Sequence, residues 1–273
     1  MPAKSVTVIS CPYHVGIRNV AVANGPTKLL EAGFVAAIRK QGITVTQVEI
    51  EPVDEFEGEI GRLFELLRRT AKAVKRIVQE DGFPIVLAGN CSITVGVQGG
   101  IAAALGSAPA CVWFDAHDDF NTPDSLTSGY LDSMCVAMSA GLCWKTLLDS
   151  IPGFKALDLN RDFIHCGMRD VIKLERSRVE AAGFPVIWGD ATRHIDFEKE
   201  LQNVLEDKNF SDTMVHLDLD ALDISVGKVN KYSAPGGLLE EDLMKCLAML
   251  PCKTKPVSLT MASFDPSFDE DDI

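Results

Sequence analysis

The chain has 273 residues with 39 acidic and 26 basic side chains, and its formal net charge of −13 argues against nucleic acid or an anionic membrane as its main partner. Hydrophobic residues make up 47% of the sequence, which suffices for a full core, yet no stretch reaches the roughly 18 unbroken apolar residues of a membrane span. The N-terminus lacks the apolar core of a signal peptide and the eight cysteines form no C-x-x-C pair, so we expect a cytoplasmic protein with reduced thiols.

Strand-like runs alternate with helical patterns along the chain. From the N-terminus, a strand run at 6–10 precedes a helical pattern at 25–42, a strand run at 43–50 and, at 57–80, the clearest amphipathic helix. Apolar or β-rich runs then predict further strands at 83–89, 110–116, 163–167, 184–189, 213–219 and 256–263. The alternation predicts an α/β fold of three αβα layers with a mostly parallel sheet, and the absence of repeats and linkers predicts one domain over residues 1–273.

Polar motifs follow the predicted strands instead of being scattered. They are Gly89-Asn90-Cys91-Ser92, Asp115–Asp119, Arg169-Asp170, Asp218-Leu219-Asp220 and Ser263-Phe264-Asp265. In open α/β sheets, ligands bind beyond the carboxyl ends of the strands. Five polar loops at that one edge therefore predict a functional site.

Two of these motifs have the composition of a metal site. Asp115, His117 and Asp119 are spaced to alternate onto one side of a strand end, and so are Asp218 and Asp220. So many carboxylates would repel one another without cations, and oxygen-rich ligands with a minority of imidazole suit Mn²⁺. Two such ions would make water acidic enough to act as a nucleophile near neutral pH. The alternative is that these acids are exposed loop carboxylates or helix caps.

The same segments resemble the arginase/agmatinase (ureohydrolase) family through most of the chain. DAHDDFNTPDSLTSGYLD is similar to the family's D-A-H-x-D segment, and DLDALDIS is similar to its D-x-D-x-L-D-P segment. AGNCS stands where the family has G-G-D-H-S, and SFDPSFD takes the place of the E-x-N-P ending. The N-terminal YHVGIRNVAVANGPTKLLEAG also resembles the family. The resemblance implies an arginase-like fold, whose usual further helix after the last strand we expect to be absent here.

The resemblance implies two Mn²⁺ ions per chain that share ligands. One ion would be held by Cys91, Asp115, Asp119 and Asp218. The other would be held by Asp115, His117, Asp218 and Asp220. In the family a hydroxide between the ions attacks a guanidinium carbon, and Asp119 would orient it here. Cys91 replaces a histidine ligand, and because a thiolate is a soft ligand for a hard ion, its site is weak or its thiol stays uncoordinated.

Other family positions are also changed in this chain. The proton-shuttling histidine falls on Asp132, which could still relay a proton, and the glutamate that contacts the guanidinium falls on Ser263. The aspartate that reads the α-amino group in arginases falls on Ile172, and a threonine near the site falls on Tyr232. The missing contacts argue against ordinary arginine as the best substrate.

Several polar residues complete the predicted site. Asn121, Ser128 and Glu175 match the family; the first two could contact a carboxylate of the substrate, and Glu175 joins Asp119 and Asp132 as a candidate catalytic residue. His14 lies in a loop after the first strand and could line the pocket together with Tyr232 and Ser263. By contrast, the histidines inside strand runs, His165 and His216, are interpreted as core residues with satisfied hydrogen bonds.

The leading hypothesis is a manganese-dependent hydrolase of a C–N bond in a small guanidino or amidino compound, such as an N-hydroxylated guanidine. The alternative is a catalytically silent relative that serves as a binding or regulatory subunit, because positions 91, 132 and 263 have all changed. A third possibility is hydrolysis of an amide such as an acetylated amine. The resemblance also implies a homo-oligomer, either a trimer or a hexamer.

Overall fold

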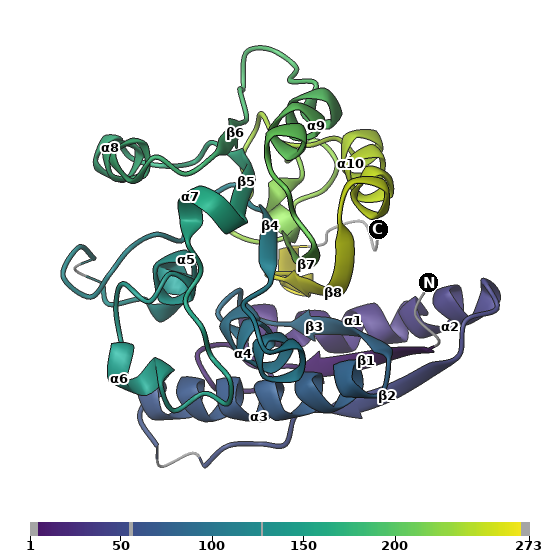
Figure 1. Cartoon of the computed structure of the whole chain (residues 1–273). Coiled ribbons are helices and arrows are strands. Elements are labelled where there is room, and N and C mark those ends of the chain that lie inside the picture. The colour runs from purple at the N-terminus through teal and green to yellow at the C-terminus, as the bar shows by residue number, and fades with distance from the viewer. Residues whose placement is uncertain (1–4, 55–56, 127, 269–273) are drawn as a thin grey trace.

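In the computed structural model, which describes residues 5–54, 57–126 and 128–268, eight strands form one sheet. They are β1 (Ser5–Cys11), β2 (Val45–Glu49), β3 (Gly82–Ala88), β4 (Ala110–Phe114), β5 (Phe163–Met168), β6 (Val186–Trp188), β7 (Asp212–Asp218) and β8 (Lys255–Ala262). Their order is β2-β1-β3-β8-β7-β4-β5-β6, and each adjacent pair is parallel (Figure 1). Each predicted strand run overlaps one of these strands, and the sheet is parallel throughout the described part of the chain.

Helices cover both faces of the sheet, which confirms the αβα arrangement (Figure 1). The helices are α1 (Gly25–Glu31), α2 (Phe34–Lys40), α3 (Glu59–Gln79), α4 (Ile93–Leu105), α5 (Cys135–Ser139), α6 (Lys145–Leu148), α7 (Leu159–Asp162), α8 (Lys173–Ala182), α9 (Phe197–Asp207) and α10 (Glu240–Lys253). Short 3-10 turns lie at Ala21–Asn24, Leu131–Met134, Leu219–Ala221 and Pro266–Phe268.

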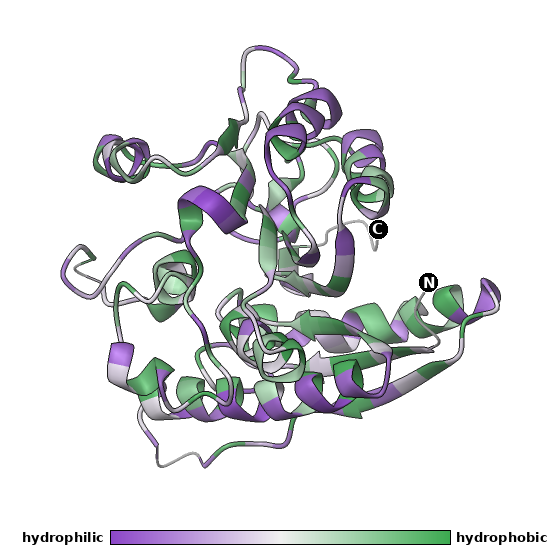
Figure 2. Cartoon of the chain, in the orientation of Figure 1, coloured by the Kyte–Doolittle hydropathy of each residue, from purple (hydrophilic) through white to green (hydrophobic). Residues whose placement is uncertain are grey.

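Successive side chains of β4 point to opposite faces of the sheet and pack into different parts of the core. Trp113 packs into the core beneath α3, α4 and α5, whereas Val112 and Phe114 pack on the opposite face with α9 and α10. Hydrophilic and hydrophobic residues alternate along α3, as Figure 2 shows. This pattern arises because one side of the helix is buried against the core and the other faces solvent. A third cluster of apolar side chains joins α1 and α2 to β1, β2 and β3.

The helix predicted over 25–42 is wrong as a single element. It is interrupted after Ala32 by Gly33, whose φ of 95° lies in the left-handed region that glycine adopts readily. The amphipathic pattern continues through the break because both α1 and α2 cover the same part of the sheet. Periodicity therefore located the covering segment but did not detect the turn inside it.

All eight cysteines lie in the described part of the chain and their thiols are free, with Cys252 the exposed one. No helix among the described residues is both long and apolar enough to cross a membrane.

Candidate metal centre

A pocket of about 190 Å³ opens at the carboxyl edge of the sheet. Most of the predicted site residues line it, namely Cys91, His117, Asp119, Asn121, Ser128, Asp132, Glu175, Asp218, Asp220, Tyr232 and Ser263. Asp115 lies behind this lining, almost fully buried, and donors from two neighbours hold its carboxylate. The strand-end motifs therefore converge on one pocket, as the sequence predicted.

The loop after β4 supplies the first acidic side chains. Asp115 accepts hydrogen bonds from the backbone of His117 at 2.7 Å and from the Trp113 indole at 3.0 Å. Because β4 ends at Phe114, the prediction that strand alternation aligns these residues is wrong. A loop with Asp119 at a φ of 45° turns that carboxylate into the pocket instead, a backbone conformation that costs energy for a non-glycine residue.

The end of β7 supplies the second pair of carboxylates. Asp218 accepts from the backbone of Asp220 at 2.8 Å, which caps the turn at Leu219–Ala221. Asp220 in turn accepts from the Asn230 side-chain amide at 3.0 Å. Asn230 also donates to the Ser263 carbonyl at 2.9 Å, so one amide joins the loops after β7 and β8.

His117 lies between the two acidic segments. Its Nδ1 is 3.4 Å from Asp115 Oδ1 and 3.5 Å from Asp220 Oδ2, and its Nε2 is 3.5 Å from Asp170 Oδ2. One ligand atom from each of Asp115, His117 and Asp220 falls within 4.8 Å of the others. We call these three residues the outer group, because His117 is partly exposed to the pocket.

The electrostatics of the site indicate a place for a cation. Burial, and then repulsion from neighbouring carboxylates, raises the pKa of both Asp119 and Asp218 well above the ordinary value. Burial would lower the pKa of His117, but the Asp220 and Asp115 carboxylates outweigh it and raise that pKa. A divalent cation would relieve this repulsion, and the oxygen-rich donor set with one imidazole fits a hard ion.

Cys91 sits in the loop between β3 and α4, at the back of the pocket. Its Sγ is 2.9 Å from Asp218 Oδ2 and 3.2 Å from Ser263 Oγ. Gly89, at the start of this loop, packs against the backbone of Tyr13, because a Cβ there would lie 2.2 Å from the Tyr13 carbonyl oxygen. Burial, and then nearby carboxylates, raises the pKa of the Cys91 thiol well above its ordinary value in the absence of a cation.

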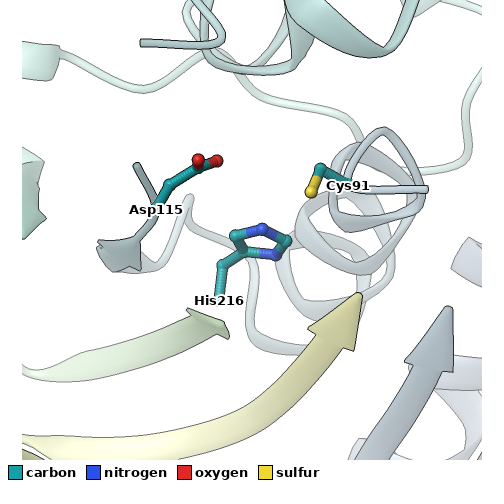
Figure 3. A group of neighbouring side chains, drawn as sticks. All are labelled: Cys91, Asp115 and His216. Atoms are coloured by element: carbon teal, nitrogen blue, oxygen red, sulfur yellow. The ribbon is translucent and has the colours of Figure 1, made fainter. Parts of the chain in front are cut away.

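Cys91, Asp115 and His216 also bring one ligand atom each within 4.8 Å of the others (Figure 3). We call these buried residues the inner group. The interpretation of His216 and His165 as satisfied core histidines is wrong in part. Both are fully buried, but Nε2 of His216 and both ring nitrogens of His165 have no hydrogen-bond partner among the described residues.

Asp132 is held firmly at the pocket wall. It accepts from the Asn90 amide at 2.5 Å and from the Ser92 backbone at 2.9 Å. Asn90 also reaches His14 Nδ1 at 3.3 Å, so His14 meets the site through Asn90 rather than as part of the pocket lining. A relay role for Asp132 and a substrate contact by His14 stay predictions.

Asn121 and Glu175 form a contact pair at the pocket wall. Asn121 donates to Glu175 Oε1 at 3.1 Å and accepts from Arg178 at 2.6 Å. Glu175 Oε2 accepts from the Ile172 backbone at 3.0 Å, which caps α8. These bonds give Glu175 a positioning function for Asn121, while the catalytic role predicted for it stays untested.

The other predicted substrate contacts lie nearer the solvent. Ser128 is exposed, and Tyr232, 43% exposed, sets its ring edge-on to His117 with 5.8 Å between ring centroids. Ile172, where arginases carry an aspartate, is 64% exposed before α8.

Sequence reasoning missed several residues that shape the site. Asn90 and Asp170 stood in the polar motifs, but no role was assigned to either of them. Tyr130, which lines the pocket beside Asn90, and Asn230 carried no local signal. Asn230 lies in an irregular loop, so only the folded chain reveals its bond to Asp220.

Comparison with known proteins points to one family. The arginase family model matches residues 4–273. The chain is 26% identical to an arginase of Bacillus subtilis over 228 residues, covering 81% of this chain and 76% of that protein. It is 25% identical to an arginase of Staphylococcus aureus over 284 residues, covering 97% and 91%.

Solved structures show the same fold. The arginase from Bacillus caldovelox superposes with a TM-score of 0.83 at 23% identity, covering 98% of this chain and 93% of that one. The match of the family model over almost the whole length, together with acidic strand ends gathered at one pocket, leads to one conclusion. The chain belongs to the arginase family.

Proposed function

We propose that this protein is a divalent-metal hydrolase that cleaves a C–N bond in a small guanidino or amidino compound, with Mn²⁺ in the outer group. The observation that carries the proposal is the convergence of Asp115, His117 and Asp220 on one pocket in a member of a family that is typically dependent on two metals. The relatives named above as arginases support the same reaction class. The acidic pocket favours a cationic substrate.

The outer group would hold the hard cation, with Asp218 beside it. When bound, divalent cations supply Lewis acidity, which makes water a nucleophile near neutral pH. Asp119, which points into the pocket from a strained loop, would accept a hydrogen bond from the attacking water and orient it. Asp132, fixed by Asn90 and Ser92, would pass a proton to the departing nitrogen.

The pocket differs from one built for unmodified arginine. Ser263 sets its hydroxyl against Cys91, so its side chain brings no charge-assisted contact to a guanidinium. The exposed Ile172 brings none to an α-amino group. Asp170, next to His117 at the pocket, is a carboxylate that could take a cationic group of the substrate in place of those contacts. We therefore propose a modified guanidine, such as an N-hydroxylated one, as the substrate class.

A catalytically silent binding subunit is the competing proposal. The observation in its favour is that Asp132 and Glu175 are both engaged by protein donors, and Cys91 stands in the place of a histidine ligand. Such a protein would still bind a cationic small molecule in the same pocket.

The test is turnover by protein loaded with Mn²⁺, across arginine, N-hydroxyarginine, agmatine, guanidinobutyrate and formiminoglutamate. We expect the modified guanidine to be cleaved fastest and Asp220→Asn to abolish cleavage. Asp212→Asn, at the start of β7, the strand that leads to Asp220, is the matched control and should keep activity. If the loaded protein cleaves none of these compounds yet binds one of them, the silent subunit is the better account.

We also propose that the protein acts in the cytoplasm, as its free thiols suggest. Assembly as a trimer or hexamer is part of the same proposal. Light scattering of the purified protein tests the assembly directly, and a monomeric mass would overturn it.

A further inference from the structure

The inner group has a donor set unlike that of the outer group. Cys91 Sγ, a carboxylate oxygen of Asp115 and a ring nitrogen of His216 all lie within 4.8 Å of one another. Figure 3 shows the three side chains converging from the loop before α4, the loop after β4 and the strand β7, with the His216 ring facing the gap between the other two. All three side chains are buried.

His216 has no explanation in the proposed hydrolysis. Thr94 Oγ1 lies 2.7 Å from its Nδ1, and its ring stacks on Trp113 with 3.7 Å between ring centroids. Its Nε2 has no partner among the residues the structure describes, although the side chain is fully buried. A buried nitrogen without a partner costs stability, so Nε2 of His216, which faces Cys91 and Asp115, is available to a ligand that would offset that cost.

The surroundings of His216 match those of a metal-binding histidine. Such a histidine uses one ring nitrogen for the metal, while a hydrogen bond at the other sets the tautomer and the ring orientation. Thr94 provides that bond at Nδ1, and Trp113 holds the plane of the ring. This leaves Nε2 as the free ligand atom.

We propose that Cys91, Asp115 and His216 form a binding site for Zn²⁺. A thiolate, an imidazole and a carboxylate together suit a borderline-soft ion, whereas Mn²⁺ prefers oxygen. Asp218, whose Oδ2 is 2.9 Å from Cys91 Sγ, is in place to complete four ligands. The inference goes beyond the proposed function, because it assigns the second cation, replaces the expected second Mn²⁺ and does not depend on turnover.

Asp115 links the inner and outer groups. Its Oδ1 lies 3.4 Å from His117 Nδ1, and the residue also belongs to the inner group. One carboxylate can therefore serve two cations of different softness, Zn²⁺ inside and Mn²⁺ nearer the pocket. The prediction is a protein that takes up one equivalent of each ion from a mixture.

The first experiment measures metal binding on the full chain without substrate. The Cys252→Ser background removes the exposed thiol, which could bind zinc by itself. Metal-free protein is titrated with Zn²⁺, Mn²⁺ and Co²⁺. We expect one equivalent of Co²⁺ to give a sulfur-to-metal charge-transfer band in the near ultraviolet, and one equivalent of Zn²⁺ to abolish it by displacement.

Three variants locate the site and one serves as control. Cys91→Ser should remove the band, and His216→Phe, which keeps a ring against Trp113, should weaken Zn²⁺ binding at least tenfold. Thr94→Val removes only the orienting bond and should weaken binding by roughly 10–100-fold. His165→Phe, also buried but on β5 and outside the inner group, should leave Zn²⁺ affinity unchanged.

Circular dichroism and melting of the metal-free variants establish that each is folded. Zinc affinity that is equal in wild type, Cys91→Ser and His216→Phe would overturn the site, and so would a cobalt adduct without the thiolate band. If the protein cleaves guanidines with two Mn²⁺ bound and shows no thiolate band with Co²⁺, the zinc site is overturned and the proposed function stands. If the protein binds Zn²⁺ through Cys91 but cleaves none of the compounds, the proposed function is overturned and the zinc site stands.

Discussion

Arg169 is a single side chain that ties several loops together beneath the pocket. Its guanidinium donates to the carbonyl oxygens of Asp220 and Leu222, both at 2.8 Å, and of Ala234 at 2.9 Å. Gly237 makes room for it, since a Cβ there would lie 2.5 Å from the guanidinium. The arginine thus supports the turn that presents Asp220 to His117.

Replacing Arg169 by methionine removes those donors and leaves partly buried carbonyl oxygens unpaired. Hydrogen bonds from a charged group contribute about 1.5–3 kcal/mol each, so we expect a loss on the order of 3 kcal/mol in the free energy of unfolding. Denaturant titration of metal-free protein measures it. Arg193→Met, at a side chain 75% exposed, should change stability by less than about 0.5 kcal/mol. Equal stability of the two variants would contradict the role given to Arg169.

Asp223, which lies outside the metal centre, should make the stability of the fold depend on pH. Burial would raise the pKa of this carboxyl, but hydrogen bonds from Ser225, Gly236 and Gly237 outweigh it and lower the pKa to about 2. A depressed pKa contributes stability above the unfolded value near 4, and the contribution is lost as pH falls toward 2. Asp223→Asn should therefore be less stable than wild type at neutral pH, and the gap should narrow between about pH 4 and pH 2. A gap independent of pH would count against this account.

At the scale of elements, α4 is positioned by glycines facing α3. A Cβ at Gly96 would lie 2.7 Å from the Leu67 carbonyl oxygen, and one at Gly100 would lie 2.6 Å from that of Ala71. The two helices therefore approach backbone to backbone. Since Cys91 and Ser92 lead directly into α4, this close packing also sets where Cys91 meets Asp218.

Gly96→Ala should separate α3 from α4. Overpacking of this kind costs about 1–3 kcal/mol, and it should weaken cation binding at Cys91 as well. Gly61→Ala, inside α3, is the matched control, because the close contact of its Cβ would be with the flexible end of the Glu57 side chain and not with backbone. The free energy of unfolding of Gly61→Ala should rise by up to about 1 kcal/mol, because alanine has a higher helix propensity than glycine. Urea unfolding of both variants measures these changes. If Gly96→Ala is as stable as the wild type, α4 is free to shift away from α3.

At the scale of the whole molecule, the parallel sheet gathers charge at one edge. The acidic loops follow β4 and β7, which are neighbours in the sheet, so Asp115 and Asp218 must lie close together. The fold holds these carboxylates in place against their repulsion, and a bound cation would offset that cost. Binding of the proposed cation would therefore be coupled to folding.

Removing metal should lower thermal stability. At a free Mn²⁺ concentration 100 times its dissociation constant, binding contributes about 2.7 kcal/mol, which corresponds to roughly 5–10 °C in the melting midpoint. Calorimetry with chelator and with added Mn²⁺ measures the difference. Asp220→Asn should show a smaller shift, and identical midpoints for wild type with and without Mn²⁺ would argue against a bound cation.

Local patterns predicted the αβα architecture and the polar strand-end motifs of the pocket, whereas residues such as Asn121, Ser128 and Glu175 were predicted from the resemblance to a known family. Apolar runs such as 110–116 mark buried strands, and acids that follow them must reach the carboxyl edge. The loop geometry of Asp119 and the break at Gly33 were not predicted, since a positive φ leaves no periodic signal.

What the sequence by itself determined was which segments form strands and which acidic motifs meet at one edge, because hydrophobic periodicity and strand-end position are properties of short stretches of chain. What only the tertiary structure decided was the environment behind that edge. His216 faces Cys91 and Asp115 because β7 is the neighbour of β4 in this register, and Asn230 meets Asp220 because their loops fold together. Such contacts join residues far apart along the chain, so the packing of the sheet, rather than any single motif, created the inner group.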